Sequence, residues 1–578
     1  MSSITTSPRT ANKLEPSDWD SWAAHLAERR KPKSIYDAIS NGKSSSLLWA
    51  IGSGDMDPET KTTMDHLFQV VRRKKSSEKR VVELLEQWLD DVPHSSSVSQ
   101  ALLSLAWCHA LPRLVELIPA AAWSQSFDRL QHITDDAKAI SLDDAPLVQQ
   151  LLAGELAFTL AYLFPELEPS DDLRESARTI LSVGADDLLD GRGLPHAGTL
   201  PIMRPLLACW TRCSLLARAA KTSCLSDRGQ IQYEWLVRQA LRCSRGDGSQ
   251  VFGTESKGKW EKHFLAAVLS LSSDPDDDAI ANVALPSHGA KSKSSSKALP
   301  DSAYQSEWSE TAILRSKWTR KSPSLTVTYA DRTIRSELNV SRETLWSGSW
   351  MPTIYINETE MRPQSEWAET CWHSDKDVDY IELEIEYSED WKLQRQLLLA
   401  RKDSFLIAAD ALLGKQSGRI DYRCTLPTGD ELGFDAATET REGFVYRKKR
   451  LGLVIPLALP EWRSELVDDG LSLTSSGLTL HQQNVGSALY APLWFDLNPS
   501  RQSKELTWRT LTVAEQLRIQ PRDTAVGYRV QVGKSQWLVY RSLAERQSRT
   551  LLGQNLFCEF FVARFLPTGE TEELLQIE

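Results

Sequence analysis

The stretch that decides the fold reads DVDYIELEIEYSEDWKLQRQLLLARKDSFLIAADALLG, from Asp377 to Gly414. Near its start, Ile381, Leu383, Ile385 and Tyr387 alternate with glutamates. A two-residue period of this kind is typical of a β-strand with one buried and one wet face. Similar alternation recurs at 325–329, 528–532 and 537–540. Gly, Asp and Pro turns separate these segments, so we expect an antiparallel β-sandwich.

The chain before residue 280 follows a helical period instead. Val81, Leu84, Leu85 and Trp88 recur at i, i+3, i+4 and i+7, which places them on one face of an amphipathic helix. The same spacing recurs in a second helix, at Leu102, Leu105, Ala106 and His109. No segment in this half alternates convincingly as a strand. Further helices are expected over 146–163, 173–189, 200–221, 230–243 and 259–272. A long run of helices followed by a run of strands excludes a doubly wound α/β fold.

The change of character falls near residue 300. Between Asp274 and Pro300 the sequence contains DPDDD and SHGAKSKSSSKALP, which hold few large apolar residues and predict a flexible linker or surface loop. We therefore predict an α+β multidomain protein. Its parts are a partly helical N-terminal extension at 1–79, a helical domain at 80–280, a linker at 281–302 and an antiparallel β-sandwich domain at 303–578.

The charge balance restricts the partners. Lys and Arg total 67 against 78 Asp and Glu, a formal net charge of −11, which argues against a general binder of nucleic acid or anionic membranes. We interpret the basic run 72–75 as the solvated face of a helix. The N-terminus has no signal-peptide pattern and no apolar run could span a bilayer, so we expect a cytoplasmic protein without membrane insertion.

The eight cysteines include no C-x-x-C pair, and most lie in apolar stretches, so we expect them to be reduced. Cys209 and Cys213 can share one helix face, but without a matching His or Cys pair they make a poor zinc site. No metal site and no cofactor is predicted.

Several of these segments resemble the heparinase II/III-like family of polysaccharide lyases. An acidic-Tyr turn at 377–380 leads into an Arg-bearing strand at 391–400, and a strand at 405–414 ends in Asp-x-h-x-Gly, where h is an apolar residue. The segment 310–318 is similar to the strand that opens the family's sandwich. The resemblance covers roughly residues 140–578. It implies an incomplete α/α toroid in the helical half, followed by the β-sandwich, with any ligand near their junction.

The resemblance also implies a reaction, the β-elimination of a uronic-acid glycan. The catalytic candidates that it suggests are His196, Tyr233 and His373. The substrate-binding candidates are Arg192, Arg245, Asp247, Arg395 and, because indoles stack on sugar rings, Trp372. The expected partner is an acidic oligosaccharide or polysaccharide.

Two other functions stay open. Where the family carries a His-x-His-x-Asp-like stretch, residues 329–340 contain no His, which favours a catalytically inactive protein that binds carbohydrate or a protein partner. The second alternative is a toroid glycoside hydrolase, which needs two carboxylates. The available carboxylates are Asp187, Asp190, Glu234 and Asp247.

The candidate residues also have structural interpretations. His196 follows a proline and could bridge neighbouring loops, and Tyr233 lies on an apolar helix stripe that predicts a core position. Arg245 fits a tight turn at a helix end. Arg395 could form an ion pair with Asp410.

Two larger sets bear on glycan binding. A positive cleft could be formed by Arg192, Arg204, Arg212, Arg238, Arg242 and Arg245. Most of the 20 tryptophans should be core residues, although a subset could line a groove. The resemblance implies that 189–196 and 245–248 are toroid loops facing the substrate. The tryptophans nearest these loops and the first sandwich strands are Trp210, Trp235, Trp260, Trp346, Trp350, Trp367 and Trp372.

Overall fold

The computed structural model describes residues 16–29, 46–52, 56–71, 77–90, 97–253, 260–285, 298–429, 431–465 and 468–578. The basic run 72–75 and most of the predicted linker lie outside these ranges. The chain divides into two compact units. Unit 1 comprises residues 1–241 and 253–278, and unit 2 comprises residues 242–252 and 279–578.

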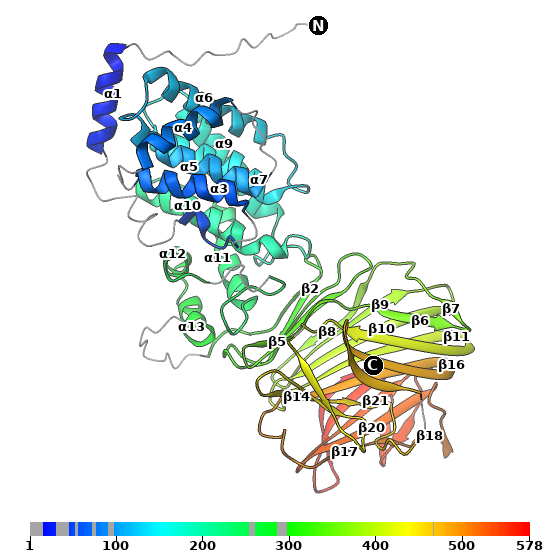
Figure 1. Cartoon of the computed structure of the whole chain (residues 1–578). Helices are drawn as coiled ribbons and strands as arrows, with labels where there is room; N and C mark the ends of the chain where they lie inside the picture. The colour runs from blue at the N-terminus through cyan, green and yellow to red at the C-terminus, as the bar shows by residue number, and fades with distance from the viewer. Residues whose placement is uncertain are drawn as a thin grey trace. The chain divides into compact units, whose positions relative to one another are not determined.

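Unit 1 is helical, and Figure 1 shows its helices in the blue to green part of the chain. They are α1 (Pro16–Arg29), η1 (Ser46–Leu48), α3 (Pro58–Val71), α4 (Glu78–Asp90), α5 (Val98–Leu114), α6 (Ala120–Ala137), α7 (Pro146–Gln149), η3 (Gln150–Leu156), α8 (Ala157–Leu163), α9 (Ser170–Asp187), η4 (Leu200–Ile202), α10 (Met203–Ala220), α11 (Asp227–Arg242), α12 (Lys262–Ser272) and α13 (Pro275–Ala284). The predicted helices correspond to α4, α5, α7 to α9, η4, α10, α11 and α12.

Two helices differ from the expectation. The expected helices do not include α6, although its buried residues Trp123, Phe127 and Leu130 follow a helical spacing. The loop predicted from Asp274 is wrong over α13, which begins with a proline and carries three aspartates in its first turn. Those carboxylates favour a helix N-terminus because they oppose its positive end.

The predicted helix 146–163 is interrupted by the π-helical segment η3. Its first residue, Gln150, is buried and donates a hydrogen bond from Nε2 to the carbonyl of Ile180 at 3.1 Å. Its Oε1 accepts a bond from the Trp210 indole at 2.9 Å. The wider turn of η3 thus carries buried polar side chains that join neighbouring helices.

Unit 2 is antiparallel, with strands in the green to red part of Figure 1. They are β1 (Tyr304–Ser306), β2 (Thr311–Arg315), β3 (Ser324–Thr328), β4 (Arg335–Val340), β5 (Glu343–Ser349), β6 (Pro352–Ile356), β7 (Thr359–Glu360), β8 (Ala368–Ser374), β9 (Val378–Glu386), β10 (Trp391–Ala400), β11 (Phe405–Leu426), β12 (Gly433–Ala436), β13 (Gly443–Tyr446), β14 (Arg450–Pro456), β15 (Gly470–Thr474), β16 (Gly477–Asp496), β17 (Leu506–Leu511), β18 (Val513–Glu515), β19 (Arg518–Ile519), β20 (Ala525–Val532), β21 (Ser535–Ser542), β22 (Arg549–Leu551), β23 (Gln554–Leu556), β24 (Phe560–Phe565) and β25 (Thr571–Ile577).

These strands form four sheets. The first runs β1-β2-β3-β4-β5, and the largest runs β12-β13-β14-β16-β11-β10-β9-β8, with β15, β6 and β7 attached to it. The other two run β17-β20-β21-β24-β25 and β19-β18-β22-β23. The predicted order, helices first and antiparallel sheets second, is confirmed.

The largest sheet is covered on both faces. Ile381 and Leu383 of β9 belong to one apolar core, whereas Tyr380 belongs to a second core shared with β17, β20, β21 and β24. Glu382 is therefore buried, and its carboxylate accepts hydrogen bonds from Tyr380 at 2.5 Å and Gln396 at 2.7 Å. The wet face predicted for β9 is wrong at this position, because a further sheet packs over it.

Two expectations from composition can be compared with the structure. None of the eight cysteines, all of which lie within the described residues, forms a disulfide. Among the described helices, none combines the length and the apolar character that crossing a bilayer requires.

Candidate functional site

Loop 189–196 connects α9 to α10 in unit 1 and presents Arg192 at its tip. A β-bridge closes the base of the loop. Oδ1 of Asp190 accepts the backbone N–H groups of Arg192 at 2.8 Å and of Leu194 at 2.9 Å. An aspartate in this arrangement stabilises a tight turn. Asp190 thus holds the loop closed, which favours a structural role for this carboxylate.

Helix α11 fixes the loop from one side. Gly193 has φ +76°, and a Cβ there would overlap the backbone nitrogen of Leu236 and lie 2.8 Å from Cβ of Trp235. Nε2 of Gln239 donates a hydrogen bond to the Arg192 carbonyl at 2.9 Å. The loop therefore lies directly against α11 beside Trp235, and only glycine fits both the conformation and the space.

Four side chains in this region reach solvent. Arg192 is exposed, and no ion pair or hydrogen bond of its guanidinium is found among the described residues. Trp235 is 40% exposed, and Ile231, one turn earlier on α11, is 56% exposed. His196 is half-buried, and its Nδ1 accepts the Gly198 N–H at 3.2 Å. The loop and helix thus offer a cation, an indole and an imidazole on unit 1.

Tyr233, the second catalytic candidate, is wholly buried in α11. Its hydroxyl lies 2.9 Å from Oγ1 of Thr211. Burial raises the pKa of the Tyr233 phenol above its usual value, so the side chain stays neutral. This geometry favours the core interpretation of Tyr233 over a catalytic one.

The third catalytic candidate, His373, lies on the edge strand β8 of unit 2. Its side chain is 43% exposed, and Nε2 lies 3.9 Å from Oδ2 of Asp375. The adjacent Trp372 is partly buried and packs against the core between the first and the largest sheets. His373 is therefore accessible, whereas most of the Trp372 ring contributes to packing.

Arg395 is 0% exposed and is bound on every side. Its Nε and Nη2 each donate to Asp410 at 2.8 Å, and its guanidinium lies 3.8 Å from the centre of the Trp350 ring. Tyr422 donates to the same carboxylate at 2.6 Å. The ion pair with Asp410 is as the structural interpretation expected, and it favours that interpretation over substrate binding.

Arg245 and Asp247 lie in the segment of unit 2 that follows α11. Arg245 donates to both carboxylate oxygens of the buried Glu337, at 2.7 and 2.6 Å. Oδ1 of the exposed Asp247 accepts the N–H of Ser249 at 2.9 Å and its hydroxyl at 2.6 Å. Both side chains thus stabilise the turn and its attachment to β4, which favours the structural interpretation.

The predicted positive cleft is wrong for four of its six arginines, because these are buried. Arg212 pairs with Glu155, and Arg238 pairs with Asp274 and Asp277. Arg204 stacks on the Trp260 ring at 4.6 Å, and Arg242 donates to the carbonyls of Asp301 and Ser302. Buried, bound arginines do not attract a ligand from solvent.

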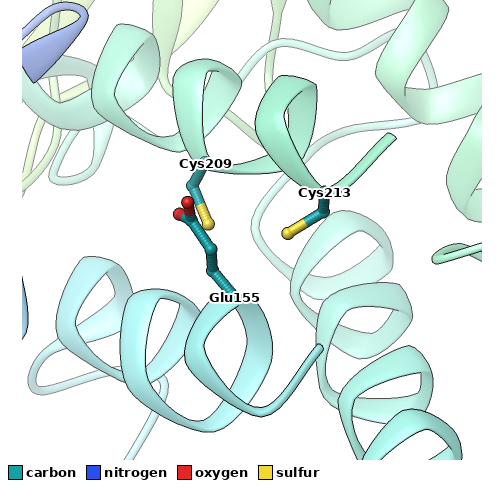
Figure 2. Close-up of side chains that lie close together, drawn as sticks. All are labelled: Glu155, Cys209 and Cys213. Atoms are coloured by element: carbon teal, nitrogen blue, oxygen red, sulfur yellow. The ribbon is translucent and has the colours of Figure 1, made fainter. Parts of the chain in front are cut away.

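Cys209 and Cys213 face Glu155 across the core of unit 1 (Figure 2), and their ligand atoms lie within 4.8 Å of one another. Arg212 already binds both oxygens of this carboxylate, at 2.5 and 2.7 Å. Burial raises the pKa values of both thiols. Protonated thiols beside a neutralised carboxylate are poor metal ligands, so we interpret the group as an ion pair packed against two cysteines.

A further polar cluster in unit 2 was missed by sequence reasoning. The half-buried Glu369 on β8 accepts hydrogen bonds from the Tyr329 hydroxyl at 2.8 Å and from Gln305 at 2.5 Å. Burial raises the pKa of the Glu369 carboxyl. Its three residues come from β1, the end of β3 and β8, and no spacing in the chain relates them.

The glycoside hydrolase alternative gains no carboxylate pair. Asp190 and Asp247 each bind backbone N–H groups of their own turns. Glu234 accepts a hydrogen bond from Gln230 at 3.0 Å. Asp187 is exposed at the end of α9.

No family model and no curated protein sequence matches the chain. Its structure is similar to the heparan sulfate lyase HepC from Pedobacter heparinus, with a TM-score of 0.57 and 11% identity over 92% of this chain and 95% of that chain. A heparinase III, the BT4657 gene product, matches with a TM-score of 0.56 and 11% identity over 94% and 93% of the two chains. Another heparinase III structure matches with a TM-score of 0.57 and 11% identity over 94% of each chain. The expected fold, an α/α toroid followed by antiparallel β-sheets, is thus confirmed as heparinase III-like.

Proposed function

We propose that this chain is a polysaccharide lyase-like protein that takes an acidic, uronic-acid glycan and cleaves it by β-elimination. The observation that carries the proposal is the heparinase III-like fold, shared over 92% of the chain with a heparan sulfate lyase. Because one fold can serve several functions, the site must supply the chemistry. Loop 189–196 supports the proposal by offering Arg192 and His196 to solvent.

The reaction requires three contributions. A group must neutralise the sugar carboxylate, a base must take the proton from the neighbouring carbon, and an acid must protonate the leaving glycosidic oxygen. The electron pair of the broken C–H bond forms a carbon–carbon double bond as the carbon–oxygen bond breaks. We assign Arg192 to the carboxylate and His196 to proton transfer, with the accessible His373 of unit 2 as a separate candidate for proton transfer.

A second candidate function, glycan binding without cleavage, is favoured by one observation. Tyr233, the phenol suggested for the reaction, is wholly buried and bound to Thr211. A buried neutral phenol cannot exchange protons with a sugar in solvent. If no other group replaces it, the fold binds the glycan and leaves it intact.

The test is incubation of the full chain with a panel of uronic-acid oligosaccharides while the ultraviolet absorbance of the unsaturated product is followed. We expect His196→Ala to lower the rate by about 10²-fold or more, the usual contribution of a general acid or base. The matched control is His263→Ala, because His263 is exposed on α12. Absence of product across the panel with binding retained would favour the second candidate, and absence of both would refute the proposed function.

A further inference from the structure

We infer that Trp235 and Arg192 form one sugar subsite on unit 1, in which the indole stacks on a sugar ring and the guanidinium binds that sugar's carboxylate or sulfate. The inference rests on the proposed function and specifies how the glycan is held. It assigns a stacking role to a tryptophan on α11 and an anion-binding role to the tip of loop 189–196.

The two side chains start close together because the loop touches the helix at Trp235. Cβ of Trp235 lies 2.8 Å from the position that a Cβ of Gly193 would occupy. Consecutive Cα atoms are about 3.8 Å apart, so Cα of Arg192 lies within roughly 8 Å of Cβ of Trp235. Two side chains that start this close can contact one sugar ring and its anionic substituent.

The geometry is also fixed before a ligand binds. Gln239, one helical turn after Trp235, holds the Arg192 carbonyl at 2.9 Å, and Asp190 holds the Arg192 N–H at 2.8 Å. Both peptide groups that flank Cα of Arg192 are therefore anchored. A site whose backbone is already ordered loses less entropy on binding.

The positive charge of the subsite comes from Arg192. Among the acidic side chains close to it in the sequence or next to Trp235, Asp186 lies 3.3 Å from Arg228 and Glu234 accepts a hydrogen bond from Gln230. Asp187 is exposed at the end of α9. Arg192 itself has no partner among the described residues, so its charge is available to a ligand.

An exposed apolar residue is common on protein surfaces, and Ile231 together with Trp235 could equally cover a protein partner. We favour an acidic sugar because the Trp235 indole can stack on its ring while the Arg192 guanidinium pairs with its anionic group. A second copy of the chain on this surface becomes an outcome of the test.

The experiment is calorimetric titration of the full chain with three oligosaccharides of equal length: an unsulfated uronate, its sulfated form and a neutral glucan. We expect Trp235→Ala to weaken binding of both acidic ligands roughly tenfold, and Trp235→Phe to restore most of it. Arg192→Ala should weaken the acidic ligands about tenfold and leave the neutral one unchanged. If Arg192→Ala loses more affinity for the sulfated uronate than for the unsulfated one, the bound group is the sulfate. Equal losses identify the carboxylate.

Matched controls are Trp462→Ala, an indole 48% exposed in unit 2, and Arg332→Ala, an exposed arginine of unit 2. If Trp235→Ala and Arg192→Ala bind like the wild type, the subsite is refuted while the proposed function stands. If the wild type binds no ligand, the proposed function fails. Loss of self-association in Trp235→Ala, with glycan binding unchanged, assigns the surface to a second copy and also refutes the subsite.

Discussion

Arg245 provides the sharpest test of whether this structure uses its arginines for folding or for substrate. Its partner Glu337 is 0% exposed and accepts five hydrogen bonds. Two come from Arg245 at 2.7 and 2.6 Å, and the others come from the Phe252 N–H, the Asn339 amide and the Ser347 hydroxyl, each at 2.8 Å. The carboxylate thus joins the segment after α11 to β4 and β5.

Arg245→Ala would leave the charge of Glu337 buried with only neutral donors. Removing one member of a buried pair costs about 3–5 kcal/mol. Because three donors remain and the Arg245 side chain is 11% exposed, we expect the lower end, about 3 kcal/mol of unfolding free energy. Glu337→Ala should cost about 5 kcal/mol, since all five donors lose their acceptor.

The assay is urea unfolding of the full chain, followed by tryptophan fluorescence, for both single variants and the double variant. The double variant should lose about 2 kcal/mol less unfolding free energy than the two single losses added together. Neither charge is then left buried without its partner. Arg332→Ala is the control for removing an exposed arginine from the same unit. The reasoning is refuted if Arg245→Ala unfolds like the wild type and loses glycan binding, because Arg245 would then be a substrate ligand.

Three further outcomes are expected. Burial, with the Arg212 charge as a second cause, lowers the pKa of His109 from 6.5 to about 4. As pH falls, His109 therefore takes up its proton in the unfolded chain before it does so in the folded chain. The unfolding free energy should therefore fall by about 3 kcal/mol as pH drops from about 6.5 to about 4, and His109→Gln should flatten this slope in urea titrations by circular dichroism. Cys209 and Cys213 are fully buried with raised thiol pKa values, so a thiol reagent should modify them only as fast as unit 1 opens; rapid modification of the native chain would contradict this. Gly193→Ala should weaken acidic-glycan binding at least tenfold, because the loop must move off α11. Unchanged affinity would show that the loop takes no part in binding.

The strands could be predicted because the two-residue period of the sequence follows the burial of alternate side chains. Alternation at Ile381, Leu383 and Ile385 predicted β9, and all three residues lie in one apolar core. What the alternation could not report is the second layer over the opposite face. Glu382 looks like a solvent-facing glutamate in the sequence, yet Arg541, 159 residues later, lies 3.3 Å from its carboxylate. Burial of a charge depends on such distant partners, which no local pattern records.

The same limit explains why the predicted positive cleft is wrong for most of its arginines. Their spacing between 192 and 245 predicted a concentration of positive charge, but a guanidinium attracts a ligand only where its charge is not already paired. Arg212 meets Glu155 57 residues before it, and Arg245 meets Glu337 92 residues after it. The partners come from separate elements, so the sequence shows the cations without the anions that neutralise them.

When the arginines with partners are excluded as candidate ligands, one candidate position for glycan binding is left on unit 1. Among the six arginines of the predicted cleft, Arg192 is the exposed one without a partner in the described part of the chain. It is also held on both flanking peptide groups, by Asp190 and Gln239. An anion that used any of the others would have to displace a carboxylate, a backbone carbonyl or an aromatic ring from a guanidinium that is at most 11% exposed, and breaking a buried pair costs several kcal/mol. The proposed recognition of an acidic sugar therefore depends on the tip of loop 189–196, which lies against α11 at Trp235.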